Sequence, residues 1–115
     1  MNVEDVRTYC LSKKAVEESF PFDEDTLVFK VAGKMFALMS LKKGDSVNLK
    51  CDPERAIELR ESYEGIYPGY HMSKIHWNTV KMLSDVPDNL FYELIDHSYD
   101  LVVEKLPKKI QKSII

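Results

Sequence analysis

The chain has 115 residues, of which 44% are hydrophobic, and a formal net charge of −3 at neutral pH. This length predicts one domain over residues 1–115, and the composition excludes a disordered chain. No apolar run approaches the roughly 20 residues of a membrane helix, and no signal-peptide pattern opens the sequence. We therefore expect a cytoplasmic protein with no membrane partner.

The first predicted element is a helix that ends near Ser12. Asn2 and Asp5 have the spacing of a capping box, and Val6 and Cys10 recur at helical spacing. Residues 15–19 are predicted to form a helical turn that the Pro-containing segment 20–22 ends. The acidic run 23–25 is interpreted as a solvated loop.

Three strands joined by hairpins are predicted next. Leu27, Phe29 and Val31 alternate with other residues, as in a strand that buries one face. Gly33 and Gly44 lie in the two predicted turns, where glycine accommodates a positive φ. The three strands are expected at residues 26–32, 34–41 and 46–51.

The second half of the chain adds two helices and two strands. Asp52 and Pro53 form a helix start, because Asp favours the N-cap position and Pro the first helical position. Gly65 is predicted to end that helix and Asp88 to cap the last one. The expected strands are residues 66–70 and 75–82, the last helix stops at Leu106 and Pro107, and residues 108–112 form a basic tail or one more helical turn.

This order of elements predicts an α+β fold. Strands joined by hairpins are antiparallel, and three amphipathic helices need one sheet face to bury against. We therefore expect two layers, a five-stranded antiparallel sheet with all helices on one face, in the order α-β(3)-α-β(2)-α.

The strand alternation predicts a basic open face on this sheet. If Val80 and Met82 face the helices, Trp77, Thr79 and Lys81 face the other way. An exposed Trp on a sheet face is typical of a contact surface. We expect Lys30, Lys50 and Lys81 to surround Trp77 there, with Phe36 a further candidate for that face.

Catalytic and metal-binding patterns are not evident. His71 and His76 are five residues apart with no Cys or carboxylate between them, which is not a metal-ligand spacing, so both are expected to be structural. Cys10 and Cys51 fall in a helix and a strand pattern and are expected to be reduced core thiols. The sequence predicts no enzyme, no metal and no cofactor.

One segment carries a family resemblance. Residues 71–80, His-Met-Ser-Lys-Ile-His-Trp-Asn-Thr-Val, resemble the His-x-(Asn/Ser)-Lys-x-His-Trp-x-Thr-Val signature of the MmcQ/YjbR family of small bacterial proteins. The resemblance extends over nearly the whole chain. It includes Tyr9-Cys10, the strand and Pro-Glu helix start at 47–54, the segment 96–99, and Leu106-Pro107.

The resemblance implies an α-β(3)-α-β(2)-α fold similar to secretion-chaperone-like domains. It also implies DNA binding through a "double wing" of hairpins, which is a proposal made at the level of the family. The signature residues carried over to this chain, without an assigned role, are His71, Lys74, His76, Trp77, Asn78 and Thr79.

Three hypotheses for function follow, and all stay open at this point. The first is a DNA-binding module in which lysines contact phosphates and Trp77 packs at the platform. The second is a protein-interaction or dimerisation module, whose partner is a second copy or another protein. The third is a small-ligand site lined by Tyr67, Tyr70, His71 and His76. The lysines of the first hypothesis are Lys30, Lys42, Lys43, Lys50, Lys74 and Lys81.

Overall fold

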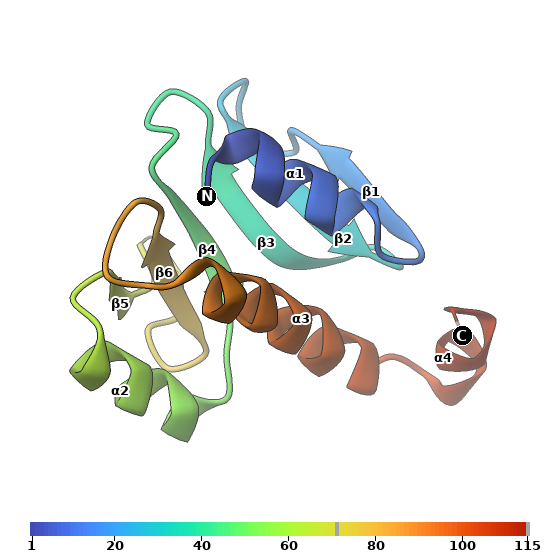
Figure 1. Cartoon of the computed structure of the whole chain (residues 1–115). Helices are drawn as coiled ribbons and strands as arrows, with labels where there is room; N and C mark the ends of the chain where they lie inside the picture. The colour runs from blue at the N-terminus through green and yellow to red at the C-terminus, as the bar shows by residue number, and fades with distance from the viewer. Residues whose placement is uncertain (71, 115) are drawn as a thin grey trace.

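A computed structural model describes residues 1–70 and 72–114 (Figure 1). The described residues form four helices and six strands. In chain order these are α1 (Val3–Leu11), β1 (Val16–Ser19), β2 (Thr26–Val31), β3 (Lys34–Ser40), β4 (Ser46–Lys50), α2 (Pro53–Ser62), β5 (Ile66–Pro68), β6 (Trp77–Lys81), α3 (Asp88–Glu104) and α4 (Lys108–Ile114).

The strands form one antiparallel sheet with the order β1-β2-β3-β4-β6-β5. The expected α+β class and antiparallel sheet are confirmed, but the expected five strands are wrong. Residues 15–19 are not a helical turn, because β1 pairs with β2 from Val16 opposite Val31 to Ser19 opposite Val28. Ala15 has a positive φ of 62° and turns the chain into this edge strand.

The helix starts follow the local signals except at α3. The capping box of Asn2 and Asp5 is present at α1, and the Asp52 carboxylate accepts a hydrogen bond from the Arg55 amide (3.1 Å). At α3 the N-cap residue is Pro87, and no side chain caps the helix. The expected cap, Asp88, lies in the first turn, where its carboxylate is 3.4 Å from the N-terminal ammonium group.

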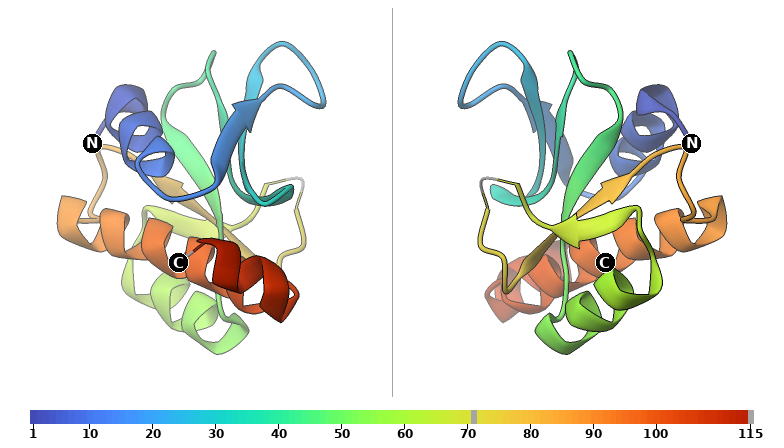
Figure 2. Two further views of the ribbon diagram at one scale, coloured as in Figure 1. Left: turned by 90° about the vertical axis from the view of Figure 1, so that its right-hand side faces the viewer. Right: turned by 90° about the vertical axis from the view of Figure 1, so that its left-hand side faces the viewer.

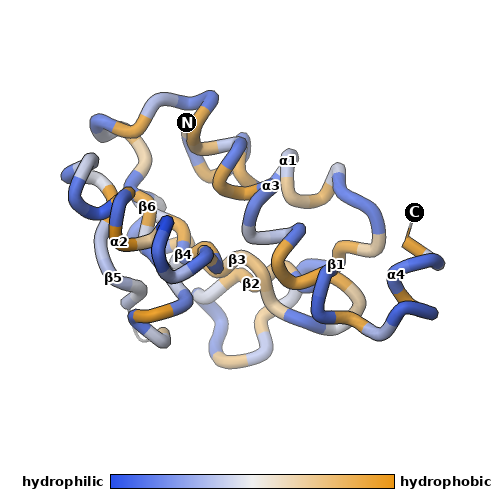
Figure 3. Tube along the Cα trace, turned by 90° about the horizontal axis from the view of Figure 1, so that it is seen from below, coloured by the Kyte–Doolittle hydropathy of each residue, from blue (hydrophilic) through white to orange (hydrophobic). Residues whose placement is uncertain are grey.

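The main core lies between the sheet and the helices. In the left view of Figure 2, α1 lies to the left of the sheet, and the β1–β2 and β5–β6 connections extend to the right. Figure 3 shows hydrophobic segments along the central strands and the helix sides that face them. The wholly buried members include Val6 of α1, Phe29 of β2, Ala56 of α2 and Ile95 of α3. The helices therefore share one face of the sheet.

A β-bulge in β3 changes the position of one predicted residue. Phe29 pairs with Ala37 and Lys30 with Met35, so Phe36 is the extra residue on β3. The bulge allows Phe36 to be completely buried in the main core. Its predicted place on the open face is therefore wrong.

Ser98 of α3 completes the hydrogen bonding at this bulge. Its hydroxyl donates to the Phe36 carbonyl (2.5 Å) and accepts from the Lys50 amide (2.9 Å). The register of β3 and β4 would otherwise place those two backbone groups opposite each other. The Ser98 side chain, which is fully buried, thus replaces a ladder hydrogen bond at the end of the two strands.

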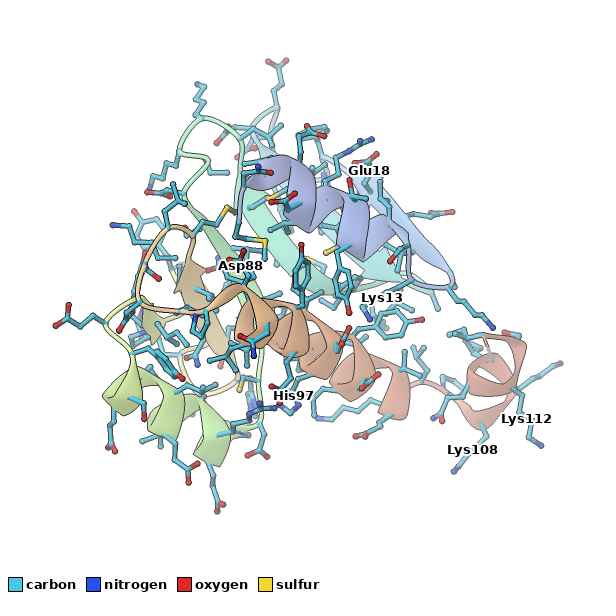
Figure 4. All side chains as sticks on the ribbon, in the orientation of Figure 1. Lys13, Glu18, Asp88, His97, Lys108 and Lys112 are labelled. Carbon is cyan, nitrogen blue, oxygen red and sulfur yellow. The ribbon has the colours of Figure 1, made fainter. Side chains whose placement is uncertain are left out.

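Charged contacts fix α1 against its neighbours. Arg7 makes two hydrogen bonds to the Glu18 carboxylate (2.8 and 2.6 Å), and Lys13 reaches Asp96 of α3 (2.5 Å). Figure 4 shows Lys13 between α1 and α3, and Glu18 on β1 beside α1. The Tyr9 hydroxyl also donates to Asp96 (2.7 Å). This arrangement joins α1, β1 and α3.

Both cysteines are free thiols buried in the main core, as expected. Burial raises the pKa of Cys10 to about 12 and that of Cys51 to about 11. A thiol with such a pKa stays protonated near neutral pH and is a poor nucleophile. None of the described helices has the length and hydropathy that crossing a bilayer requires.

Candidate functional site

The face of the sheet opposite the helices, called the open face below, carries a second, smaller apolar cluster. Val28, Leu38 and Trp77 are its buried members, and Met35 and Met72 pack against them. The strand phase predicted for Trp77 is therefore correct. Its predicted exposure is wrong, because only 8% of the residue is accessible.

The β5–β6 loop, residues 69–76, explains this burial. Its first part folds back over β6, and the Gly69 amide donates to the Trp77 carbonyl (2.9 Å). A Cβ at Gly69 would lie 2.8 Å from the Trp77 Cβ, so this close approach requires glycine. The loop then brings Met72 onto Trp77.

Three polar groups hold the returning loop against the open face. The Thr79 hydroxyl donates to the Asn48 side-chain carbonyl (2.5 Å) and accepts from the Tyr70 amide (3.1 Å). The Asn48 amide group donates in turn to the Tyr70 carbonyl (3.3 Å). This closed network joins β4, β6 and the β5–β6 loop. Its members, Asn48, Tyr70 and Thr79, come from distant parts of the sequence.

Above this network the open face is hollowed into a groove of about 610 Å³. We call it the open-face groove. Its walls include apolar and aromatic side chains from the β1–β2 loop (residues 20–25), β3, β5 and the β5–β6 loop. Phe22, Tyr67 and Tyr70 are respectively 63%, 40% and 57% exposed, so part of each side chain reaches the surface of the groove. The apolar and aromatic lining residues are Phe22, Leu38, Met39, Tyr67, Tyr70 and Met72.

The floor of the groove is polar. Alternate residues of the strands point to the open face, and in this part of the sheet they carry hydroxyl or amide groups. These groups offer both donors and acceptors to a ligand. The floor residues are Thr26, Ser40, Ser46, Asn48 and Thr79.

Two carboxylates at one end of the groove are held by the chain itself. Asp23 accepts from the amides of Thr26 (2.6 Å) and Asp25 (2.9 Å), which lower the pKa of its carboxyl. Asp25 accepts from the Ser40 hydroxyl (2.6 Å) and the Lys42 amide (2.7 Å), which lower its pKa likewise. Both groups are therefore ionised at neutral pH. The acidic run is a loop, as predicted, and two of its three carboxylates also line the groove.

The β3–β4 turn, residues 41–45, reaches the β5–β6 loop across the groove. The Lys43 ammonium lies 4.8 Å from the centre of the Tyr70 ring, within the range of a cation–π interaction. Lys43, Asp45 and Tyr70 all line the groove. An ammonium group is thus already bound to its aromatic wall.

The lysines predicted to bind phosphate lie at several places around the sheet. Lys42 is close enough to Asp23 and Asp25 for its charge to contribute to their lowered pKa values. The Lys74 ammonium donates to the Gly69 carbonyl (3.3 Å).

The remaining three predicted lysines lie at strand ends. Lys81 pairs with Ser46 at one end of β4, and Lys50 pairs with Trp77 at the other end. Lys30 pairs with Met35 next to the bulge. The sheet thus separates Lys81 from Lys50 by the length of β4, and Trp77 is covered.

The signature residues have different positions. Asn78 is 2% exposed and faces the helices, where its amide group donates to the Ala56 carbonyl (3.3 Å). Its side-chain oxygen has no partner and adjoins a cavity of about 10 Å³. His76 was expected to pack inside, but it is exposed. Its backbone carbonyl accepts a hydrogen bond from the Cys51 amide (2.8 Å). His71 lies outside the described residues.

His97 has a structural role that sequence reasoning did not identify. Its Nε2 accepts a hydrogen bond from the Asp52 amide (3.1 Å) at the start of α2. Figure 4 shows its side chain on the lower side of α3. Burial, together with the nearby Arg55 guanidinium, lowers the pKa of the imidazole. The neutral ring therefore links α3 to α2.

The groove includes residues that sequence reasoning missed. Tyr67 and Tyr70 of the ligand hypothesis line it, and His76 does not. The alternation of β4 placed Ser46 and Asn48 on the open face, which was a usable signal. Nothing local indicated that Phe22 and Met72 would join them. Within residues 1–70 and 72–114, no three His, Cys, Asp or Glu side chains are arranged to hold a metal ion.

Comparison with known proteins identifies relatives over the full length. The uncharacterized protein YbdF of Escherichia coli O157:H7 is 38% identical over 112 residues, which cover 96% of this chain and 92% of that protein. The uncharacterized protein YjbR of Escherichia coli strain K12 is 32% identical over 116 residues, covering 100% and 98%.

Solved structures share the fold. The crystal structure of Deinococcus radiodurans protein DR2400, described by the domain DUF419, has a TM-score of 0.91 at 42% identity and covers 97% of this chain and 86% of that one. A Pseudomonas syringae protein has a TM-score of 0.76 at 28% identity, covering 88% and 98%. The YjbR family model matches residues 11–101. Because the family model matches most of the chain and the relatives match nearly all of it, the chain belongs to the YjbR family.

Proposed function

We propose that the protein binds a small organic molecule in the open-face groove. The observation that carries this proposal is the groove itself, with its volume of about 610 Å³. Ligand pockets in proteins commonly measure about 300–1,000 Å³ and combine apolar walls with a few positioned polar groups. The aromatic walls and the hydroxyl and amide floor provide both features.

The polar groups of the groove support binding rather than chemistry. Asp23 and Asp25 are engaged by backbone amides and by Ser40, and Thr79 is bonded to Asn48. The two thiols of the chain lie in the main core. We therefore propose a binding protein without catalytic activity. The absence of an enzyme activity and of a cofactor stays a prediction.

The sole tryptophan of the chain provides the first measurement. Trp77 packs on Leu38 and Met72, and both of these also line the groove. A ligand that contacts either residue should change the emission of Trp77. A screen of small aromatic fragments, balanced between cationic, neutral and anionic members, should give fragments that change this emission and shift the amide NMR signals of groove residues.

A matched pair of variants locates the site. Tyr67→Ala removes a 40% exposed ring from the groove, whereas Ile57→Ala removes a 53% exposed side chain from α2, outside it. We expect Tyr67→Ala to weaken fragment binding about tenfold or more, which is the range for loss of one aromatic contact, and Ile57→Ala to leave it unchanged. If no fragment class perturbs groove signals, the proposal is wrong.

DNA binding is the second candidate function. The observation that favours it is the exposure of Lys42, Lys43 and Lys74 on two hairpin connections, together with the family-level double-wing proposal. Binding through several phosphate contacts should weaken about tenfold or more between about 50 mM and 200 mM salt.

A titration of a short duplex, followed by fluorescence anisotropy, separates the two candidates. Lys42→Ala combined with Lys43→Ala should weaken DNA binding at every sequence, whereas Tyr67→Ala should leave it unchanged. No binding at the lower salt concentration would eliminate the DNA candidate and leave the groove candidate intact. The dimerisation hypothesis stays a prediction that the solution mass tests directly.

A further inference from the structure

From the chemistry of the open-face groove we infer the class of its ligand: an organic cation that places a positively charged nitrogen over the Tyr70 ring and an apolar body along Tyr67 and Met72. This inference rests on the proposed function of the groove. It adds the charge and the position of the recognised group.

The charge of the groove lining favours a cation. Among the lining residues that the structure describes, three carry carboxylates, Asp23, Asp25 and Asp45, and one, Lys43, carries an ammonium group. Lys42 lies near two of the carboxylates without lining the groove, and with it the carboxylates still outnumber the ammonium groups, three to two. Charges of one sign in a concave site concentrate ligands of the opposite sign.

Hydrogen bonds keep the carboxyl groups of Asp23 and Asp25 ionised and in place. A carboxylate that must bind a cation has to be ionised, and hydrogen bonds from backbone amides favour the ionised form. Asp23 accepts two such bonds, at 2.6 and 2.9 Å, and Asp25 accepts one at 2.7 Å. The same bonds fix both carboxylates at the groove, so a ligand meets a preformed field.

An ammonium group, that of Lys43, already lies over the Tyr70 ring in the groove. Lys43 places its Nζ 4.8 Å from the centre of the Tyr70 ring. A flexible surface lysine loses side-chain entropy when it holds its ammonium group over the ring. When Lys43 leaves the ring, water solvates its ammonium group well, so the contact is easily given up. A ligand cation with an apolar body would also contact Tyr67 and Met72, which line the same groove, and would compete with Lys43 for the ring.

The geometry also separates this ligand from an anion. An anionic group over Tyr70 would face the negative side of the aromatic ring and the carboxylate of Asp45 in the same groove. Within residues 1–70 and 72–114, Lys43 would be its one cationic partner in the lining. A quaternary ammonium, in contrast, needs no hydrogen bond and is well suited to an aromatic wall.

The test uses three probes of one shape on the full chain. They are choline, its uncharged isostere with a tert-butyl group in place of trimethylammonium, and the tert-butylacetate anion. Amide NMR titrations would follow Leu38, Asn48, Tyr67 and Thr79, together with the Trp77 indole signal. We expect choline to bind about tenfold more tightly than the isostere, as a cation–π contact within a negative field allows, and tert-butylacetate more weakly still.

Two variants examine the position of the charge. Tyr70→Leu keeps an apolar wall and should remove the preference for choline over its isostere. Lys43→Met removes the competing ammonium group and should raise the affinity for choline about twofold or more. Ile57→Ala, outside the groove, should change neither value. Circular dichroism of each variant verifies that the fold is intact.

The outcomes are separable from those of the proposed function. If the isostere or the anion binds the groove as tightly as choline, the cation inference is wrong and the groove still binds ligands. If none of the three probes shifts groove signals, the cation inference is also wrong. The balanced fragment screen then decides the proposed function independently, because its neutral and anionic members do not depend on this inference.

Discussion

The two faces of the sheet carry alternate residues of the same strands, yet they exclude water by different means. On the helix side, Phe29 and Ile95 are completely buried under a continuous layer of α1, α2 and α3. On the open face, Trp77 forms a small cluster with Val28 and Leu38, the β5–β6 loop folds back over Trp77, and Met35 and Met72 pack against the cluster. A loop covers only part of a sheet, and the uncovered part is the groove.

With the proposed function, this difference would give stability mainly to the helix side and binding to the open face. Polar residues on the helix side are few and serve the backbone, as Ser98 does at the bulge. Polar residues on the open face, such as Ser46 and Asn48, remain accessible because no helix covers them. Substitutions on the two faces should therefore have different consequences, and four measurements examine that expectation.

The largest effect is expected for Phe29→Ala. This side chain is completely buried beneath the helices, so its removal leaves a cavity and should lower the free energy of unfolding by about 3–5 kcal/mol. Leu38→Ala, on the open face, should cost about 2 kcal/mol, because groove water can fill the space. Urea denaturation followed by circular dichroism measures both values. Equal losses would contradict the distinction between the faces.

Ser98→Ala should give the next largest effect. It leaves the Phe36 carbonyl and the Lys50 amide without their shared partner, and each unpaired buried group costs about 1–3 kcal/mol. We expect a total of about 2–4 kcal/mol. The control is Ser113→Ala, which removes an exposed hydroxyl from α4 and should cost less than about 0.5 kcal/mol. A Ser98→Ala protein as stable as this control would refute the role of Ser98.

Thr79→Val examines the network that holds the β5–β6 loop. Valine keeps the shape of threonine but leaves the Asn48 carbonyl and the Tyr70 amide without their partner, at a cost of about 1–2 kcal/mol. The loop should loosen, so the Tyr70 amide should exchange faster and the Trp77 emission should move to longer wavelength. Thr79→Ser keeps the hydroxyl and should preserve both properties; identical behaviour of the two variants would exclude this network.

The smallest effect is the pH dependence due to His97. The pKa of the folded imidazole lies below the unfolded value of about 6.5, so the folded state favours the neutral ring. This contribution to stability is complete above the unfolded pKa and is lost as the pH falls toward the folded pKa. His97→Gln retains an acceptor for the Asp52 amide but does not titrate.

Unfolding free energies of the two proteins between about pH 5 and pH 8 measure the His97 term. The difference between them should change in favour of the variant as the pH falls. The other histidines are present in both proteins and cancel in the difference. Parallel curves would show that His97 does not contribute.

The sequence alone determined most local features, because the signals act within a few residues. The capping box of Asn2, the start of α2 at Asp52 and Pro53, and the hairpin at Gly33 depend on backbone hydrogen bonding and dihedral preference. The alternation of β6 likewise placed Thr79 and Asn78 on opposite faces. The antiparallel sheet and the α+β class follow from these local features and from the order of the elements.

Only the tertiary structure decided what covers the open face and where it stays uncovered. Residues 16–19 have weak strand character and form β1 because the edge of β2 offers them backbone partners. The burial of Trp77 depends on a loop that returns across β6, held by hydrogen bonds between Asn48, Tyr70 and Thr79. Contacts between such distant positions are set by packing and backbone hydrogen bonding, which no local pattern encodes. Trp77 was predicted in the correct strand phase, but its burial and the groove beside it were not predicted.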